Sequence, residues 1–303
     1  MNSRRTIIKG IFLSFIFILF FGFFISGLRV FFIGSISEGA SNNSISDSQN
    51  ILLPQEDLEN LESEINAESA IVLESDLSGP EGHTDKIIFE KNSELKLPIA
   101  SLTKLMTAVI SLNNYDLLKK ITISKEADLQ QAMKTDLKLG DVFSTADLLY
   151  IMLIESSNKA AYALSEQVGE KEFVALMNQR AKELGLKNTF YADPTGLSSE
   201  NVSTAEDLTG LAKYILKNYP EIAQISRTKE YDVPNFGKII NTNQLLGEIP
   251  EIIGGKTGFT TDAKGCLLLV VYNPKGDDYL IYIILGADDR FSEMKKLINL
   301  TNQ

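Results

Sequence analysis

Ser101 and Lys104 are the first residues whose types and spacing point to chemistry. At three positions apart on a helix, their side chains lie about 60° apart around the axis, so the lysine amine can reach the proton of the serine hydroxyl. The amine acts as a base only when it is neutral, which requires burial or a neighbouring cation. The predicted helix here is apolar and would be buried, where lysine is rare. The pair therefore indicates a serine nucleophile with a lysine base.

Two further polar motifs follow this pair along the chain. S-S-N at 156–158 comes directly after a strongly apolar stretch with helical spacing, and K-T-G at 256–258 begins a predicted strand. With S-L-T-K at 101–104 they give the order S-x-x-K, S-x-N, K-T-G. This combination is the signature of penicillin-binding proteins and class A β-lactamases. Each motif alone is common, whereas the three in this order are specific.

Over residues 70–300 the chain resembles the low-molecular-mass D-alanyl-D-alanine carboxypeptidases, which are serine DD-peptidases. The segments that carry the resemblance are IASLTKLMTA, GDVFSTADLLYIMLIESSNKAA, FYADPTGLSSENVSTAEDL and KTGFTTDAKGCL. The resemblance implies an α+β fold of the β-lactamase/DD-peptidase kind, in which N- and C-terminal strands form an antiparallel sheet flanked by helices, beside a mainly helical subdomain. Lys159, after the second motif, stands where the family usually has Asp.

The resemblance also implies roles for the residues of the first two motifs. Ser101 would be the acylated nucleophile, and Lys104 would be its general base. Ser156 would relay a proton between Lys104 and the leaving amine. Asn158 would hydrogen-bond the substrate amide and steady Lys104.

The third motif would complete the site. By the same resemblance, Lys256 would place a positive charge beside Lys104 and so lower the pKa of Lys104. Thr257 would contact the terminal carboxylate of the substrate, and Gly258 would allow a close backbone approach. The backbone N–H groups of Ser101 and Phe259 would form the oxyanion hole.

Arg290 opens the last predicted helix. By resemblance it matches the family arginine that helps to bind the carboxylate of D-alanine. The alternative interpretation is an ordinary surface charge at a helix end.

The implied reaction removes the terminal D-alanine of a peptidoglycan stem peptide through an acyl-enzyme on Ser101, without a metal or cofactor, and penicillin would acylate the same serine. Three alternatives stay open. A class A-like β-lactamase needs a deacylating glutamate, but neither Glu200 nor Glu206 lies in an E-x-x-x-N arrangement. A DD-endopeptidase or transpeptidase would use the same residues. A membrane-tethered sensor would bind β-lactams or muropeptides without turnover.

Composition excludes several other classes of site and partner. The only cysteine, Cys266, excludes an intrachain disulfide and a cysteine-based zinc site. The only histidine, His83, excludes a multi-histidine metal site, and a Ser-His-Asp triad would have to use it. The net charge is −11, although the first thirty residues carry only basic charges. The rest of the chain is therefore strongly acidic, and we expect it to repel the phosphates of nucleic acid.

The N-terminal residues predict a membrane anchor. Residues 10–28 form an uncharged apolar run of about the length that a transmembrane helix needs, and Arg4, Arg5 and Lys9 precede it. We therefore expect a cytoplasmic N-terminus at 1–9, a single-pass anchor in the cell membrane at 10–28, a flexible linker at 29–67, and a serine DD-peptidase domain at 68–303 on the extracytoplasmic side. The sequence does not indicate an oligomeric state.

Apolar periodicity predicts the elements that must position the motifs. Strands are expected near both ends of the domain, with helices between them and one closing helix. The expected strands are 70–74, 86–90, 266–272 and 279–285, and the expected helices are one opened by Pro98, a mostly helical stretch over 125–185, one over 204–218 and one over 290–300.

Overall fold

The computed structural model describes residues 62–76, 85–131, 137–273 and 278–301. The predicted anchor at 10–28, most of the predicted linker, and His83 lie outside these residues. Within the described part of the chain, no helix is long and apolar enough to cross a membrane.

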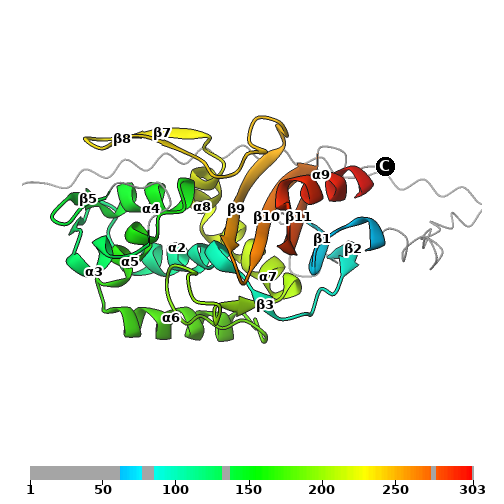
Figure 1. Ribbon diagram of the computed structural model, residues 1–303, viewed down its shortest axis with the longest axis horizontal. Helices are drawn as coiled ribbons and strands as arrows, with labels where there is room; N and C mark the ends of the chain where they lie inside the picture. The colour runs from blue at the N-terminus through cyan, green and yellow to red at the C-terminus, as the bar shows by residue number, and fades with distance from the viewer. Residues whose placement is uncertain (1–61, 77–84, 132–136, 274–277, 302–303) are drawn as a thin grey trace, which may run out of the picture. The chain divides into compact units, whose positions relative to one another are not determined.

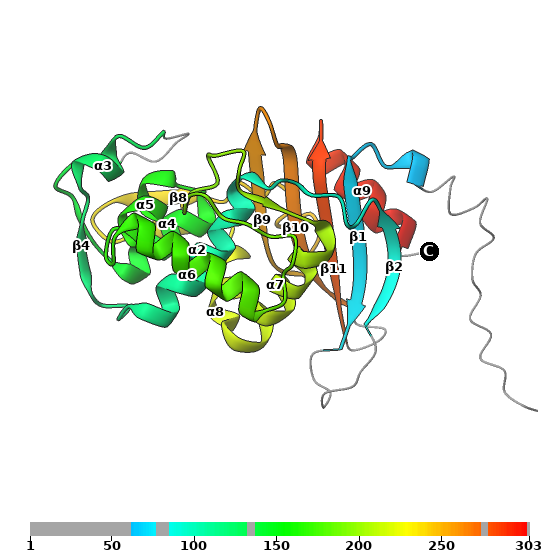
Figure 2. The ribbon, with the colours of Figure 1, turned by 90° about the horizontal axis from the view of Figure 1, so that it is seen from below.

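A five-stranded antiparallel sheet forms the centre of the described domain, in the order β2-β1-β11-β10-β9. Strands from the two ends of the domain lie side by side in it, since β1 pairs with β11 from Ser69 opposite Leu285 to Ser75 opposite Tyr279. Figure 2 shows β9 at one edge of the sheet and β2 at the other. The bounds are β1 Ser69–Ser75, β2 Lys86–Lys91, β9 Ile252–Thr260, β10 Lys264–Asn273 and β11 Asp278–Ala287.

Both faces of the sheet are covered, which explains the continuous apolar sequences of β10 and β11. One face packs against α9, Arg290–Thr301, together with Ile65 and Ala67 from the start of the domain. The other face packs against the helical region (Figure 1). Cys266 is buried in β10, and burial raises the pKa of its thiol to about 12, so the thiol stays protonated.

The helical region holds the first two motifs. Ser144 starts α4 with a reciprocal capping box, and Ser157 caps α5 by accepting a hydrogen bond from the N–H of Ala160. The helices are α2 Thr103–Asn114, α3 Lys125–Asp128, α4 Thr145–Ile154, α5 Asn158–Ser165, α6 Glu170–Glu183, α7 Ala205–Asn218 and α8 Pro220–Ser226.

The predicted α+β arrangement is confirmed, with differences at the site. Pro98 does not open a helix, because Leu97–Pro98 pairs as β3 with β6, Val202–Ser203. A short 3₁₀ helix, η1, spans Ala100–Leu102, and α2 begins after it. Small strand pairs that the periodicity did not predict join β4 Lys120–Thr122 to β5 Val142–Ser144 and β7 Glu230–Val233 to β8 Gly237–Ile240.

Candidate active site

The three motifs meet where β9 lies beside η1. Ser101 lies in η1 and Lys104 in the first turn of α2, S-S-N spans the junction of α4 and α5, and K-T-G lies on β9. Figures 1 and 2 show β9 next to the start of α2. The fold therefore brings together residues that are up to about half the chain apart in sequence.

Lys104 lies at the centre of this group and is fully buried. Its Nζ donates to Ser101 Oγ at 2.9 Å, Asn158 Oδ1 at 2.6 Å and the carbonyl of Thr195 at 2.5 Å. An ammonium has three N–H donors, and all three are used here. When Lys104 loses a proton, two donors can hold Asn158 and Thr195 while the lone pair faces the Ser101 hydroxyl.

Burial lowers the pKa of Lys104 to about 7, and the negative charge of Asp193 opposes this shift. A large fraction of the amine is therefore neutral near pH 7. Loss of solvent is the main cause of this shift, and the family resemblance also predicts repulsion from Lys256. The pKa of Lys256 is lowered well below its usual value by burial, by the charge of Lys104 and by the charge of Arg290. Because repulsion between two cations is mutual, the effect of Lys256 on Lys104 stays a prediction.

Ser156 and Lys256 form the second contact between motifs. Lys256 is buried, and its Nζ donates to Ser156 Oγ at 2.9 Å and to the carbonyl of Thr257 at 3.1 Å. Ser156 has φ of 64°, a left-handed conformation that is uncommon outside glycine and asparagine and recurs at functional sites. This backbone turn interrupts the helix that periodicity predicts through the motif.

Asn158 and its neighbour Lys159 connect α5 to the chain around α3. Asn158 Nδ2 donates to the carbonyl of Gln131 at 2.7 Å. Lys159 Nζ donates to Asp128 Oδ1 at 2.6 Å and to the carbonyl of Leu137 at 2.7 Å. Lys159, which stands where the family usually has Asp, thus binds the neighbouring segment around α3. Asn158 still contacts Lys104.

Gly258 brings the backbone of β9 against the turn that carries Ser101. A Cβ at Gly258 would lie 3.0 Å from the carbonyl oxygen of Ile99 and 3.1 Å from the N atom of Ser101. The N–H of Gly255 points away from β10, because it donates to Ser226 Oγ at 3.0 Å. Because N–H directions alternate along an antiparallel strand, the N–H of Phe259 points to the same outer edge. The N–H of Phe259 therefore points away from β10, and the N atom of Ser101 lies beside the neighbouring Gly258.

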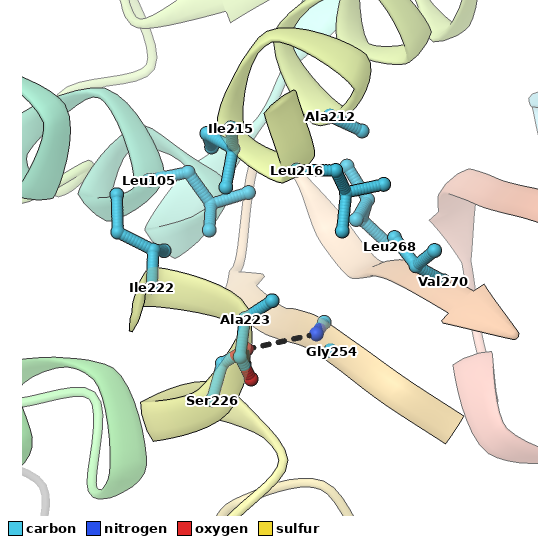
Figure 3. A pocket seen from close by; sticks show the side chains of 11 residues that line it. Leu105, Ala212, Ile215, Leu216, Ile222, Ala223, Ser226, Gly254, Leu268 and Val270 are labelled. Carbon is cyan, nitrogen blue, oxygen red and sulfur yellow. Dashed lines mark hydrogen bonds between the residues drawn. The ribbon is translucent and has the colours of Figure 1, made fainter. Parts of the chain in front are cut away.

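A small apolar cavity lies between this part of the sheet and helices α7 and α8. Figure 3 shows Leu105, Ile215, Ile222, Gly254 and Leu268 among the residues that line it. Its volume of about 20 Å³ holds about one water molecule. The cavity is too small for a peptide and does not enlarge the site.

Thr257 and Arg290 are the residues predicted to bind a carboxylate. Thr257 is buried, and its Oγ1 lies 2.5 Å from Oγ1 of Thr242. Arg290 stacks over the ring of Phe291 at 4.7 Å, and its Nε is buried without a hydrogen-bond partner in the described residues. Its charge also lowers the pKa of Lys256. Arg290 is therefore not a freely solvated surface charge.

No motif in the sequence points to Asp193, which organises the turn beside Lys104. Its two oxygens accept five hydrogen bonds, from the N–H groups of Thr195, Gly196 and Ser198 and from the side chains of Thr195 and Asn201. Burial alone would raise the pKa of Asp193, but these bonds outweigh it and lower the pKa. The only signal was the segment ADPTGLSS, which contributed to the family resemblance.

Gly196 in that turn packs directly against the residue before the nucleophile. Its φ is 83°, and a Cβ there would lie 2.0 Å from the carbonyl oxygen of Ala100. Ala100 itself is left-handed, with φ of 47°. The position of Ser101 is thus set by the turn from one side and by β9 from the other.

The two glutamates weighed for a β-lactamase do not lie beside Lys104. Glu200 is exposed. Glu206 is exposed at the start of α7, where its N–H donates to the carbonyl of Ser93, close to the β2 edge of the sheet. The acidic group whose charge acts on Lys104 is Asp193, and both of its carboxylate oxygens already accept hydrogen bonds.

Comparison with known proteins agrees with this geometry. Residues 55–289 match the family described as D-alanyl-D-alanine carboxypeptidase, which is well over half of the 303 residues. The chain belongs to the D-alanyl-D-alanine carboxypeptidase family. The family resemblance predicted from the three motifs is confirmed.

Relatives in this family have more than one named activity. The chain is 37% identical over 249 residues to a D-alanyl-D-alanine endopeptidase of Pseudomonas aeruginosa, covering 78% of this chain and 77% of that protein. It is 35% identical over 248 residues to the D-alanyl-D-alanine carboxypeptidase DacF of Bacillus subtilis, covering 77% of this chain but only 61% of that protein.

Solved structures of the carboxypeptidase family's relatives share this fold. Penicillin-binding protein D2 from Listeria monocytogenes, in its ampicillin-bound form, matches with a TM-score of 0.70 and 29% identity, over 79% of this chain and 98% of that one. The predicted DD-peptidase α+β fold is therefore confirmed.

Proposed function

We propose that this protein is a serine D-alanyl-D-alanine carboxypeptidase that removes the terminal D-alanine of peptidoglycan stem peptides. Neutral Lys104 takes the Ser101 proton as Oγ attacks the carbonyl carbon between the two D-alanines. The N–H groups of Ser101 and Phe259 stabilise the oxyanion. Ser156 passes a proton to the leaving amine, free D-alanine departs, and water then hydrolyses the acyl-Ser101 ester.

The observation that carries this proposal is the state of Lys104. A buried amine with a pKa of about 7, 2.9 Å from the Ser101 hydroxyl, is suited to act as a general base at neutral pH. Thr195 and Asn158 hold the amine in place, and Lys256 adds a donor at Ser156. On the substrate side, Thr257 and Arg290 would bind the carboxylate of the departing D-alanine, and Asn158 the peptide amide.

The test is release of D-alanine from diacyl-L-Lys-D-Ala-D-Ala by the full chain in detergent, with Ser101→Ala as the control. We expect release that depends on Ser101, and covalent labelling by fluorescent penicillin that Ser101→Ala abolishes. The ampicillin complex of the Listeria relative supports the second expectation. Penicillin labelling without peptide turnover would favour the sensor, and rapid penicillin hydrolysis without D-alanine release would favour a β-lactamase.

A DD-endopeptidase is the second candidate function, and a specific observation favours it. The proteins of Pseudomonas aeruginosa and Escherichia coli that this chain matches over 77% and 73% of their lengths are both named D-alanyl-D-alanine endopeptidases. Digestion of purified cross-linked muropeptide dimers distinguishes the two activities. Cleavage of dimers to monomers faster than release of D-alanine from monomers would assign the endopeptidase.

Anchoring in the cell membrane, with the catalytic domain outside, forms part of the same proposal. The apolar run at 10–28 after three basic residues supports it, as does a substrate that lies outside the cytoplasm. Protease treatment of spheroplasts, in which the outer face of the cell membrane is accessible, followed by immunoblotting, would test the orientation. Loss of the domain signal is expected, whereas complete protection in spheroplasts with loss after lysis would contradict it.

A further inference from the structure

A second hydroxyl lies beside the one predicted to contact the substrate carboxylate. Thr242, between β8 and β9, has its Oγ1 2.5 Å from Oγ1 of Thr257. Neither threonine belongs to the serine–lysine pair or to the S-S-N motif. Their contact therefore lies in the part of the site that is predicted to bind the substrate carboxylate.

The backbone around Thr242 is held from two directions. Its N–H donates at 3.1 Å to the carbonyl of Ile154, the last residue of α4 and two positions before Ser156. The side-chain amide of Asn241 donates at 2.9 Å to the carbonyls of Ser226 and Thr228 at the end of α8. Thr242 is thus fixed relative to both the second motif and the helix that contacts β9.

The number of available protons decides what the Thr242 hydroxyl can do. Each hydroxyl has one proton to donate. If Thr257 donates to Thr242, Thr257 has no proton left for an anion. If Thr242 donates to Thr257, the Thr257 proton is free. Within the described residues, Thr242 Oγ1 has no other hydrogen-bond partner, so nothing there competes for its proton.

We propose that Thr242 is a positioning residue that donates to Thr257 Oγ1 and directs the Thr257 proton toward the terminal carboxylate of the substrate. This inference rests on the proposed peptidase function. A bound carboxylate attracts the Thr257 proton, and hydrogen bonds in such a chain strengthen one another. Thr242 therefore acts on the recognition of a free carboxylate and not on the chemistry at Ser101.

Two thioester substrates separate these effects. Both have the same diacyl-L-Lys-D-Ala acyl group, and their leaving groups are mercaptoacetate, which has a carboxylate, and its neutral methyl ester. For Thr242→Val, which keeps the shape and removes the hydroxyl, we expect kcat/KM to fall about tenfold on the carboxylate substrate, mainly through KM. On the neutral substrate we expect kcat/KM to stay within about twofold of the wild-type value.

Companion variants remove the ambiguity of a folding defect. Thr242→Ser restores the hydroxyl and should restore the preference for the carboxylate substrate, and Thr242→Ala should lose it as Thr242→Val does. Thr228→Val is the matched control, because the Thr228 hydroxyl donates to the carbonyl of Gln224 at 3.0 Å and lies outside the pair. In a Thr257→Val background, Thr242→Val should cause no further loss on either substrate.

The outcomes distinguish the inference from the function on which it rests. A wild-type protein that hydrolyses neither thioester overturns both. If the wild type is active, equal losses on the two substrates, or no loss on the carboxylate substrate, overturn the role of Thr242 alone. An additional loss in the Thr257→Val background would likewise overturn the proposed order of donation.

Discussion

The two edge strands of the central sheet, β2 and β9, are protected from contact with other chains in opposite ways. An edge strand leaves backbone groups unpaired, which invites contact with another chain. At the β2 edge, Lys86 and Glu90 are exposed, and Ile87 is 50% exposed. Charged side chains in water protect this edge.

The β9 edge is instead buried along most of its length. Residues 254–258 are buried, and Lys256 is among them. The Ser226 hydroxyl covers the N–H of Gly255, while Phe259 beyond it is 52% exposed. An edge strand that carries catalytic groups therefore needs cover over its charged side chains, and an opening only where the backbone of the substrate would bind.

The largest expected effect is on activity, at the buried lysine beside the β9 edge. Lys104→Met keeps the length of the side chain and removes the base, so kcat/KM for D-alanine release should fall about a thousandfold or more. Steady-state kinetics on the diacyl tripeptide measures this loss. A fall of less than tenfold would mean that another group accepts the Ser101 proton.

The same substitution should change how stability depends on pH. The pKa of Lys104 is about 7 in the folded state and 10.5 in the unfolded chain, so between these values the unfolded state binds more protons. Stability of the wild type should therefore rise with pH over this window, by about 3 kcal/mol from pH 7 to 10 relative to Lys104→Met. Urea unfolding of both proteins at several pH values measures the difference. Parallel pH profiles would show that Lys104 titrates normally.

A smaller loss is expected from a single methyl group on β9. In Gly255→Ala the new Cβ would lie 2.5 Å from the carbonyl oxygen of Leu268, which is backbone and cannot rotate away. The strand must shift, at a cost of about 2 kcal/mol in unfolding free energy. Denaturant unfolding followed by circular dichroism tests this, and an unchanged midpoint would show that β9 is looser than its packing indicates.

The smallest effect should come from the opposite edge. Lys86→Gln removes an exposed charge on β2, so the unfolding free energy should change by less than about 0.5 kcal/mol and D-alanine release should be unchanged. The same two assays apply. A loss comparable to that of Gly255→Ala would remove the contrast between the edges.

Sequence alone predicted the sheet strands and the three motifs, because alternating or continuous apolar runs and short fixed spacings are local properties. The strands around 266–272 and 279–285 fall within β10 and β11. The prediction that Pro98 opens a helix was wrong, because Pro98 lies in β3, which forms only by pairing with Val202–Ser203, about a hundred residues away. No local pattern contains that partner.

Site residues outside the motifs could not be predicted for a similar reason. Asp193 and Thr242 are ordinary turn residues in the sequence, and their importance comes from contacts with Thr195 and Thr257. The extent to which Lys104 is buried could not be predicted either, since it depends on how α2, α5 and the 193–198 turn pack together. Sequence spacing shows that a serine and a lysine can come into contact, but it does not show how completely their surroundings exclude water.

Pairing between Ser69 and Leu285 also limits the order in which the chain can fold. β1 lies between β2 and β11, so the hairpin of β1 and β2 keeps an unpaired edge until the end of the domain has been synthesised. Contacts so distant in sequence require a large loop to close and make folding slow. During that interval the exposed apolar strands are open to aggregation, and a chaperone that binds extended segments would protect them.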